Sequence, residues 1–385
     1  MTRLIEFVIA LALVLALFLV IGLVLPSSRS LQESVETNRR MTIVFDTLNN
    51  VRRLKDWNPL IPSAANELSY SGGENNTGVG AKVDFNSANA AWGQGSWEIV
   101  TSERPTTPGT PGKIVYSIVD KRMGSDKQAT FDLLPTGKDN RNVKITQSYQ
   151  VTYGFNLIGR YAGMYVSRHV GDAVKAGLGK LTNMLATVPN FDYRTEGSPL
   201  TDLKIVDVPS EDLLVVNAGN IDRTNDAIKA SIKQNQEWIK RVMDANGLVA
   251  AGPLRVITTD FGSEKYAFDI AQPVRKGSAA PKADAAADAA PVTPPATPVA
   301  STGELKVTIP SGAPVEYVRT EARKSAFASY TGYMAELDNQ RNALRAWAVT
   351  GGHEVVDRPY ESWKSGVDAS FEADGKFDIY WAVKQ

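Results

Sequence analysis

The feature that most constrains this chain is an unbroken apolar run near its amino terminus, from Phe7 to Leu25. At about 1.5 Å per residue, a helix of these 19 residues spans a hydrocarbon core of about 30 Å. Cleaved secretory signals have apolar regions of about 7–15 residues and end at a small-residue site. This run instead continues into Pro26-Ser27-Ser28. The sequence therefore predicts an uncleaved membrane anchor, with a cleaved signal as the alternative.

The charges flanking the apolar run bear on its orientation. Arg3 precedes the run, whereas Arg29, Arg39 and Arg40 follow it, so the positive-inside count alone favours a cytoplasmic body. However, this is a single span, and a large trailing domain can be translocated regardless of its charge. We therefore expect a single-pass membrane protein whose domains lie outside the cytoplasm.

Composition excludes several functional classes. The chain has 42 Lys and Arg against 42 Asp and Glu, so it lacks the basic surface typical of nucleic-acid binding, and no nucleic-acid partner is expected. It has no cysteine and only two histidines, His169 and His353. A thiolate nucleophile and a multi-histidine metal site are excluded, and a serine-histidine-acid triad is poorly supported. We predict no metal and no cofactor. We interpret both histidines as structural residues.

Between residues 31 and 188, hydrophobic periodicity predicts several strands followed by one long helix. Apolar residues alternate over 79–85 and 143–153, which is typical of half-buried antiparallel strands, and shorter strands are expected at 97–100, 113–119 and 130–134. A short helix over 43–55 leads into Asp56-Trp57-Asn58-Pro59. The long helix is indicated by an i+3 and i+4 stripe: Val166, Val170, Val174, Leu178, Leu181 and Leu185.

This order of elements, with its Trp-Asn-Pro corner, resembles the START-like helix-grip superfamily, also labelled SRPBCC or polyketide cyclase/dehydrase. The resemblance implies an α+β domain over 31–188, in which an antiparallel sheet wraps a long carboxy-terminal helix. It also implies a tunnel for an apolar or aromatic ligand, without implying cyclase chemistry. Aromatic residues are the candidate lining, with core filling as the alternative for each of them: Trp57, Trp92, Trp97, Tyr116, Tyr149 and Tyr153.

The rest of the chain contains two copies of one unit, over 203–274 and 315–383. Each copy begins with an expected strand, at 213–217 and 315–319, continues into a helix, and ends on Phe-Asp-Ile with a valine four residues later. Between them, residues 276–302 are almost entirely small residues and proline, which predicts a flexible linker. An internal repeat is the simplest account.

This tandem strand-helix-strand-strand pattern, with its Gly-Pro step at Gly252, resembles the GyrI-like effector-binding domain. The resemblance covers 201–385 and implies a groove between the two halves with an acidic residue on the last strand. That residue maps to Asp378, with Asp269 as its repeat partner, flanked by Tyr380 and Trp381. The alternative is a solvated strand aspartate, because strand alternation puts Asp378 and Tyr380 on the face opposite Trp381. An anchor followed by these two domains suggests a bacterial inner-membrane protein.

Two functional hypotheses follow. The first is a non-enzymatic, membrane-anchored protein that binds small apolar or cationic aromatic molecules, because the chain offers aromatic cavities but no convincing catalytic set. The second is a hydrolase or cyclase acting on a small hydrophobic substrate, with Glu98 or Tyr149 taking part. Whether the chain is an enzyme is left open, with binding favoured.

Overall fold

The computed structural model describes residues 2–107, 109–194, 199–262, 264–277 and 303–384. As the sequence predicts, the chain is α+β, with two antiparallel sheets and one apolar helix at the amino end. It divides into two compact units. The first comprises Met1–Asn190 with Thr350–Gly352, and the second comprises Phe191–Val349 with His353–Gln385.

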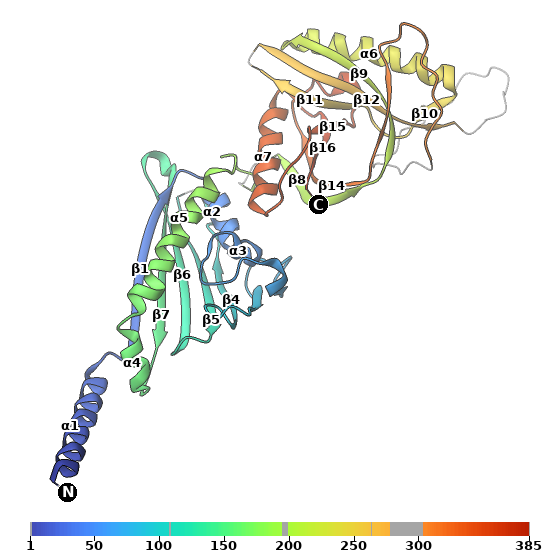
Figure 1. The fold of residues 1–385 in the computed structure, drawn as a ribbon. Helices are drawn as coiled ribbons and strands as arrows, with labels where there is room; N and C mark the ends of the chain where they lie inside the picture. The colour runs from blue at the N-terminus through green and yellow to red at the C-terminus, as the bar shows by residue number, and fades with distance from the viewer. Residues whose placement is uncertain (1, 108, 195–198, 263, 278–302, 385) are drawn as a thin grey trace. The chain divides into compact units, whose positions relative to one another are not determined.

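Helix α1 (Thr2–Val24) contains the apolar run (Figure 1). Its segment Arg3–Val24 is long and apolar enough to cross a membrane. Its large apolar side chains are exposed almost throughout, from Leu4 to Val24. A core helix of a soluble domain would bury such residues, so this exposure agrees with an apolar surrounding.

The first unit contains a seven-stranded antiparallel sheet in the order β1-β7-β6-β5-β4-β3-β2. Alternate residues point to an inner face, where Ile114, Tyr116, Phe131 and Ile145 are fully buried. The strands are β1 (Ser28–Thr37), β2 (Leu68–Ser71), β3 (Lys82–Asn86), β4 (Gln94–Glu103), β5 (Gly112–Asp120), β6 (Ser125–Thr136) and β7 (Asn142–Thr152).

The expected helix over 43–55 is broken into three pieces, which corrects the sequence prediction. Asn50 has an extended backbone, and its side chain accepts a hydrogen bond from the Arg52 backbone N–H at 3.0 Å, which ends one helix and begins the next. The pieces are α2 (Met41–Leu48), the 3-10 turn η1 (Val51–Arg53) and α3 (Leu54–Trp57); further short turns are η2 (Ala65–Glu67) and η3 (Lys138–Asn140).

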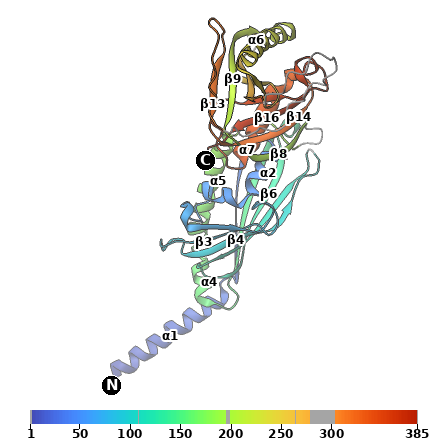
Figure 2. The same ribbon diagram turned by 90° about the vertical axis from the view of Figure 1, so that its right-hand side faces the viewer.

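The long helix at the end of this unit is also divided. Helix α4 (Leu157–Gly163) is followed by a π-turn, η4 (Ser167–Gly171), and then by α5 (Asp172–Ala186). Helix α5 runs along the sheet beside β1, as Figures 1 and 2 show. Its apolar stripe is buried, and Gly177 lets it approach the corner closely, because a Cβ there would lie 3.0 Å from Pro59 Cδ.

The second unit contains a nine-stranded sheet in the order β13-β9-β12-β11-β15-β16-β14-β8, with β10 paired to β12. The order of the eight strands other than β10 is symmetric about the central β11–β15 pair, so each of these strands has a counterpart in the other half. The strands are β8 (Leu200–Val208), β9 (Glu211–Asp222), β10 (Leu248–Ala250), β11 (Arg255–Phe261), β12 (Lys265–Lys276), β13 (Glu316–Thr320), β14 (Arg323–Thr331), β15 (Tyr360–Trp363) and β16 (Lys376–Ala382).

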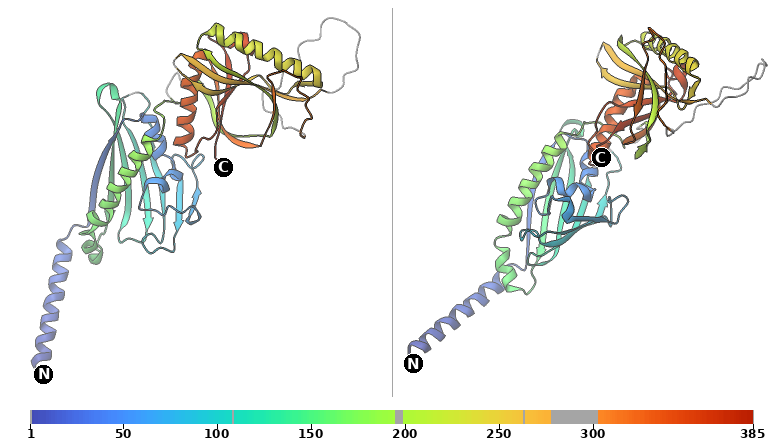
Figure 3. Two further views of the ribbon diagram at one scale, coloured as in Figure 1. Left: turned by 45° about the horizontal axis from the view of Figure 1, so that its top comes forward. Right: turned by 45° about the vertical axis from the view of Figure 1, so that its right-hand side comes forward.

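Helix α6 (Asn225–Asn246) packs against β9 and β12, with Thr224 as its N-cap and Gly247 in the left-handed conformation as its C-cap. Figure 3 shows the sheet curling strongly, with α6 along its outside. Helix α7 (Leu337–Thr350) lies on the same face, where Arg341 pairs with Glu361 of β15. Among the described residues, no helix of this unit packs on the other face, which we call the helix-free face. Two short elements complete the unit: η5 (Met334–Glu336) and α8 (Gly366–Ala369).

One strand of the second repeat copy differs from the expectation. The strand predicted over 315–319 exists as β13, but it pairs with β9 of the first copy. The counterpart of β9 is β14, whose small and polar residues give no strong strand signal. The expected linker over 276–302 lies outside the described residues from 278 onward.

Candidate functional site

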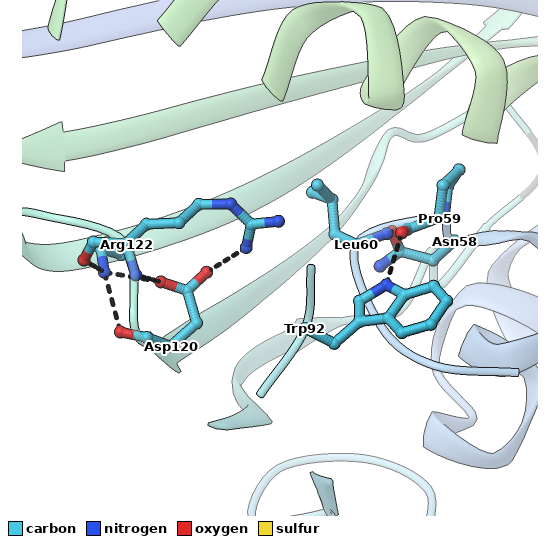
Figure 4. Close-up of polar contacts among 7 residues, drawn as sticks. Asn58, Pro59, Leu60, Trp92, Asp120 and Arg122 are labelled. Atoms are coloured by element: carbon cyan, nitrogen blue, oxygen red, sulfur yellow. Dashed lines mark hydrogen bonds and ion pairs between the residues drawn. The ribbon is translucent and has the colours of Figure 1, made fainter. Parts of the chain in front are cut away.

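A charged cluster lies on the inner face of the first unit, at the turn between β5 and β6. Lys127 Nζ lies 2.7 Å from Asp120 Oδ1. Arg122 Nη1 lies 2.6 Å from Asp120 Oδ2 (Figure 4). Lys127 also donates to the Arg122 carbonyl oxygen. The side chains of Lys127 and Asp120 are only 3% and 5% exposed, whereas that of Arg122 is 30% exposed. We call these three residues the Asp120 cluster.

The electrostatics of this cluster favour a carboxylate. Burial opposes ionisation of Asp120, but the hydrogen bond from Lys127 and the charges of Arg122 and Lys127 outweigh burial, so its pKa lies below the ordinary value. Burial raises the pKa of Tyr149, and the charge of Asp120 raises it further. Tyr149 is thus a neutral phenol next to an ionised carboxylate. Tyr153, the next inward tyrosine on this face, also has a raised pKa, chiefly through burial.

The Trp-Asn-Pro corner contributes aromatic and polar groups to the same unit. The Trp92 indole N–H donates to the Pro59 carbonyl oxygen at 3.0 Å, and the Asn58 side chain accepts from the Leu60 backbone N–H at 3.0 Å (Figure 4). Deeper inside, Trp57 packs edge-to-face on Phe131, with ring centroids 5.8 Å apart. These hydrogen bonds and this ring contact therefore hold the corner in place.

Three buried polar atoms near this corner have no hydrogen-bond partner among the described residues. They are the Trp57 indole nitrogen, the Asn58 amide nitrogen and the side-chain oxygen of Gln147. Gln147 lies opposite Phe131 in the β7–β6 register, and Phe131 contacts Trp57. Buried polar atoms usually have partners. These donors and this acceptor are thus available to a polar group on a ligand.

Of the six predicted aromatic residues of this unit, Trp92 lies at the corner, and the other five occupy two places. Trp57 and Trp97 belong to one buried aromatic core, linked through Tyr116 and Phe131. Tyr149 lies further along β7, toward the Asp120 cluster, and Tyr153 directly follows the end of β7.

In the second unit, the predicted aspartates lie on the helix-free face. The register places Asp269 opposite Ile257 and Asp378 opposite Ser362, which are equivalent positions in the two copies. The two side chains are 9% and 5% exposed. Asp269 pairs with Arg358 at 2.8 Å, and Asp378 pairs with Lys364 at 3.1 Å. Asp378 also accepts from Ser329 Oγ, and Asp269 from the Asn217 amide. Both acids are therefore buried and paired.

Aromatic rings lie on the same face as these acids, near Asp378. Tyr360 and Tyr380 stack with centroids 4.8 Å apart, and Phe327 packs against Tyr380 at 5.1 Å. Arg255 lies over the Tyr360 ring and forms a buried ion pair with Glu211 at 2.6 Å. Burial raises the pKa of Tyr360 to about 12, against the lowering effect of Arg255. The Tyr360 hydroxyl has no hydrogen-bond partner among the described residues. We call Asp269, Asp378, Tyr360, Tyr380 and Phe327 the tyrosine site.

The last predicted residue, Trp381, does not join this site. It lies on the opposite face of β16, half-buried, where its indole N–H donates to the Asp357 carbonyl oxygen at 3.2 Å. A separate polar cavity of about 550 Å³ lies between β9 and α6 and contains none of the predicted site residues. His169 is exposed in the π-turn, and no metal-binding cluster occurs within the described ranges.

Comparisons with known proteins give only distant similarity. No protein-family model matches the chain, and the comparison with curated proteins gives no match. Among solved structures, the chain is similar to norcoclaurine synthase of Thalictrum flavum, with 13% identity, coverage of 41% of this chain and 94% of that one, and a TM-score of 0.31. It is also similar to the EcmrR C-terminal domain, with 14% identity, 48% and 98% coverage, and a TM-score of 0.32.

A further match is EcmrR in its complex with DNA, with 14% identity, coverage of 60% of this chain and 72% of that one, and a TM-score of 0.35. All three matches have a sequence identity of 14% or less. Their scores are low, so neither family nor function follows from them. The evidence for the two candidate sites, the Asp120 cluster and the tyrosine site, is therefore their geometry alone.

Proposed function

We propose that this chain is a membrane-anchored binding protein for small molecules, in which a helix-grip domain (31–188) precedes a GyrI-like tandem domain (201–385). The tyrosine site carries the proposal: stacked rings lie on the same sheet face as two buried carboxylates, and each carboxylate is neutralised by one cation from a loop. The ligand class that fits is a cationic aromatic molecule. The first unit would hold an apolar or aromatic ligand beside Trp57, Tyr149 and Tyr153.

The ion pairs support exchange with a cationic ligand. The side chains of Arg358 and Lys364 are 43% and 34% exposed, so either can rotate into water at modest cost. A ligand cation that takes its place leaves the buried carboxylate neutralised, which avoids the large penalty of an unpaired buried charge. The ring faces of Tyr360 and Tyr380 would add a cation–π contribution.

We therefore expect Asp378→Asn to weaken binding of a cationic aromatic dye at least tenfold, a loss of about 1.4 kcal/mol, while a neutral dye of the same shape binds as before. Calorimetric titration of the full-length protein with both dyes measures this difference. Asp207→Asn is the matched control, because Asp207 is 83% exposed on β8. Equal affinities of the two dyes for the parent protein would rule out charge recognition at this site.

A second candidate function is catalysis in the first unit, and the Asp120 cluster is the observation that favours it. A carboxylate, an amine and a phenol on one buried face are group types used in general acid–base catalysis. Native mass spectrometry of the protein with a co-purified small molecule separates the two functions. A molecule recovered unchanged supports binding, whereas conversion to a new mass that is lost in Lys127→Met supports catalysis.

We also propose that this chain is a single-pass protein of a bacterial inner membrane, with both units outside the cytoplasm. We expect an alkaline phosphatase fusion at the carboxy terminus to be active and a β-galactosidase fusion at the same point to be inactive, because these reporters work on opposite sides of the membrane. The reverse pattern would invert the orientation. A mature chain beginning near Ser27 would show that α1 is a cleaved signal.

A further inference from the structure

The end of α1 is held by the short helix α4. The Arg160 guanidinium donates to the carbonyl oxygens of Leu23 at 2.9 Å and Leu25 at 3.1 Å, while its Nε donates to Gly154. Arg160 is only 8% exposed. A cation at this position satisfies carbonyls that lack helical partners and complements the negative end of the helix. The last turn of α1 is therefore attached to the first unit.

A second contact lies further along α1. The Tyr161 ring stacks on Phe18 with centroids 4.5 Å apart, and its hydroxyl donates to the Phe18 carbonyl oxygen at 2.8 Å. Gly22 permits this close approach, because a Cβ there would lie 3.2 Å from Leu157 Cβ. Phe18 lies six residues before Val24, which is about 9 Å along the helix. Helix α4 thus runs beside the last two turns of the apolar helix.

The outward side of α4 and its flanks is apolar. Phe155 is 90% exposed and Ile158 62%, and Met164 and Tyr165 are more than half exposed. At the same end of the sheet, where Ser125 and Ser28 both lie opposite Thr152, the β5–β6 turn exposes Met123. These five residues form what we call the α4 face. An exposed phenylalanine beside a membrane-spanning segment is costly in water and favourable at a lipid surface.

The charge around the α4 face also suits lipid headgroups. From Tyr153 to Gly171 the sequence has no acidic residue, and Arg168 within this stretch is exposed. Interfacial helices combine apolar side chains buried about 5–10 Å into the headgroup region with nearby basic groups. The 9 Å overlap of α4 with α1 falls in that range. Aromatic Tyr161 and Tyr165 are residue types enriched at this depth.

We propose that the α4 face inserts into the headgroup region of the bilayer that α1 spans. This inference rests on α1 as an anchor and goes beyond the proposed ligand binding. It places the Asp120 cluster, which belongs to the same β5–β6 turn as Met123, at the membrane end of the first unit. A hydrophobic ligand would then reach the inner face from the lipid rather than from water.

The chain contains no cysteine, so single cysteines can carry spin labels without further mutation. Full-length Phe155→Cys and Ile158→Cys proteins are spin-labelled and placed in vesicles of phosphatidylcholine and phosphatidylglycerol. We expect both labels to collide with oxygen more often than with an aqueous nickel complex. Leu134→Cys is the matched control, because Leu134 is also exposed but lies at the opposite end of β6. It should favour the nickel complex.

A label at Leu15→Cys reports whether α1 itself lies in the bilayer, which separates failure of the anchor from failure of the α4 face. If this label favours oxygen while those at 155 and 158 behave like the one at 134, the proposal is wrong. Dipolar broadening between labels at 155 on two copies, without an oxygen preference, would assign the face to a dimer and also overturn the proposal. Unchanged melting temperatures confirm that each labelled protein is folded.

Discussion

Replacing Glu361 with glutamine is expected to destabilise the second unit by about 3–5 kcal/mol. Glu361 is fully buried, and its carboxylate accepts from Arg341 Nε at 2.6 Å and from Arg341 Nη2 at 3.1 Å. Burial disfavours the charge of Arg341, but the Glu361 carboxylate more than compensates, so the pKa of Arg341 lies above its usual value. Glutamine keeps the shape and leaves an unbalanced guanidinium inside the protein.

Urea unfolding, followed by hydrogen exchange of peptides that cover β15, measures the second unit separately. Glu354→Gln is the matched control, because Glu354 and its partner Lys384 are each 66% exposed, and its cost should be below about 1 kcal/mol. The double change Arg341→Met with Glu361→Leu should recover most of the stability, since an apolar pair can replace a buried ion pair. A Glu361→Gln protein as stable as the control would contradict this account.

Asp120→Asn should destabilise the first unit by a similar amount, about 3–5 kcal/mol at neutral pH. The variant leaves Lys127, which is 3% exposed, without its carboxylate, whereas the more exposed Arg122 can turn toward water. The same variant removes a pH dependence. Because the folded pKa of Asp120 is lowered, its stabilisation is present above the unfolded pKa of about 3.9 and is lost as the pH falls through the folded value.

Unfolding of both proteins between neutral and acidic pH tests the two parts of this prediction. The parent should lose stability below about pH 4 more steeply than Asp120→Asn. Asp84→Asn is the control, because Asp84 pairs with Lys82 on the surface and is 43% exposed. Parallel pH profiles for the parent and the Asp120 variant would show that the cluster contributes nothing through its charge.

The sequence predicts the strands of the first unit well because their alternation is strong, but it does not reveal the Asp120 cluster. The sequence around this cluster is typical of a charged surface turn, and it contains Asp120, Arg122 and Lys127. Lys127 continues the inward alternation of Ala129, Phe131 and Leu133 on β6, so it lies on the inner face. Its charge is typical of a surface residue, and residue type alone therefore does not predict its burial.

The sequence does contain an indication of the Arg341–Glu361 pair. Arg341 falls at i+4 from Leu337 and i−3 from Leu344, so it interrupts an apolar helical stripe where a charge requires a buried partner. The partner could not be identified, because Glu361 lies on a strand predicted only by analogy with the first copy. The aspartates Asp269 and Asp378 could be proposed as candidate site residues because both belong to the repeated Phe-Asp-Ile sequence. Their cations, Arg358 and Lys364, come from loops that do not repeat and were not predicted.

The sheet of the second unit has a consequence for how the protein is made. Strand β8 pairs with β14, and β13 pairs with β9, so each half supplies an outer strand to the other. During translation, the outer edge of β9 has no strand to pair with until residues 316–320 have emerged from the ribosome. Neither half can complete its hydrogen bonding alone. A stalled or truncated chain would present an unpaired edge to its neighbours, so this region should depend most on chaperones during biosynthesis.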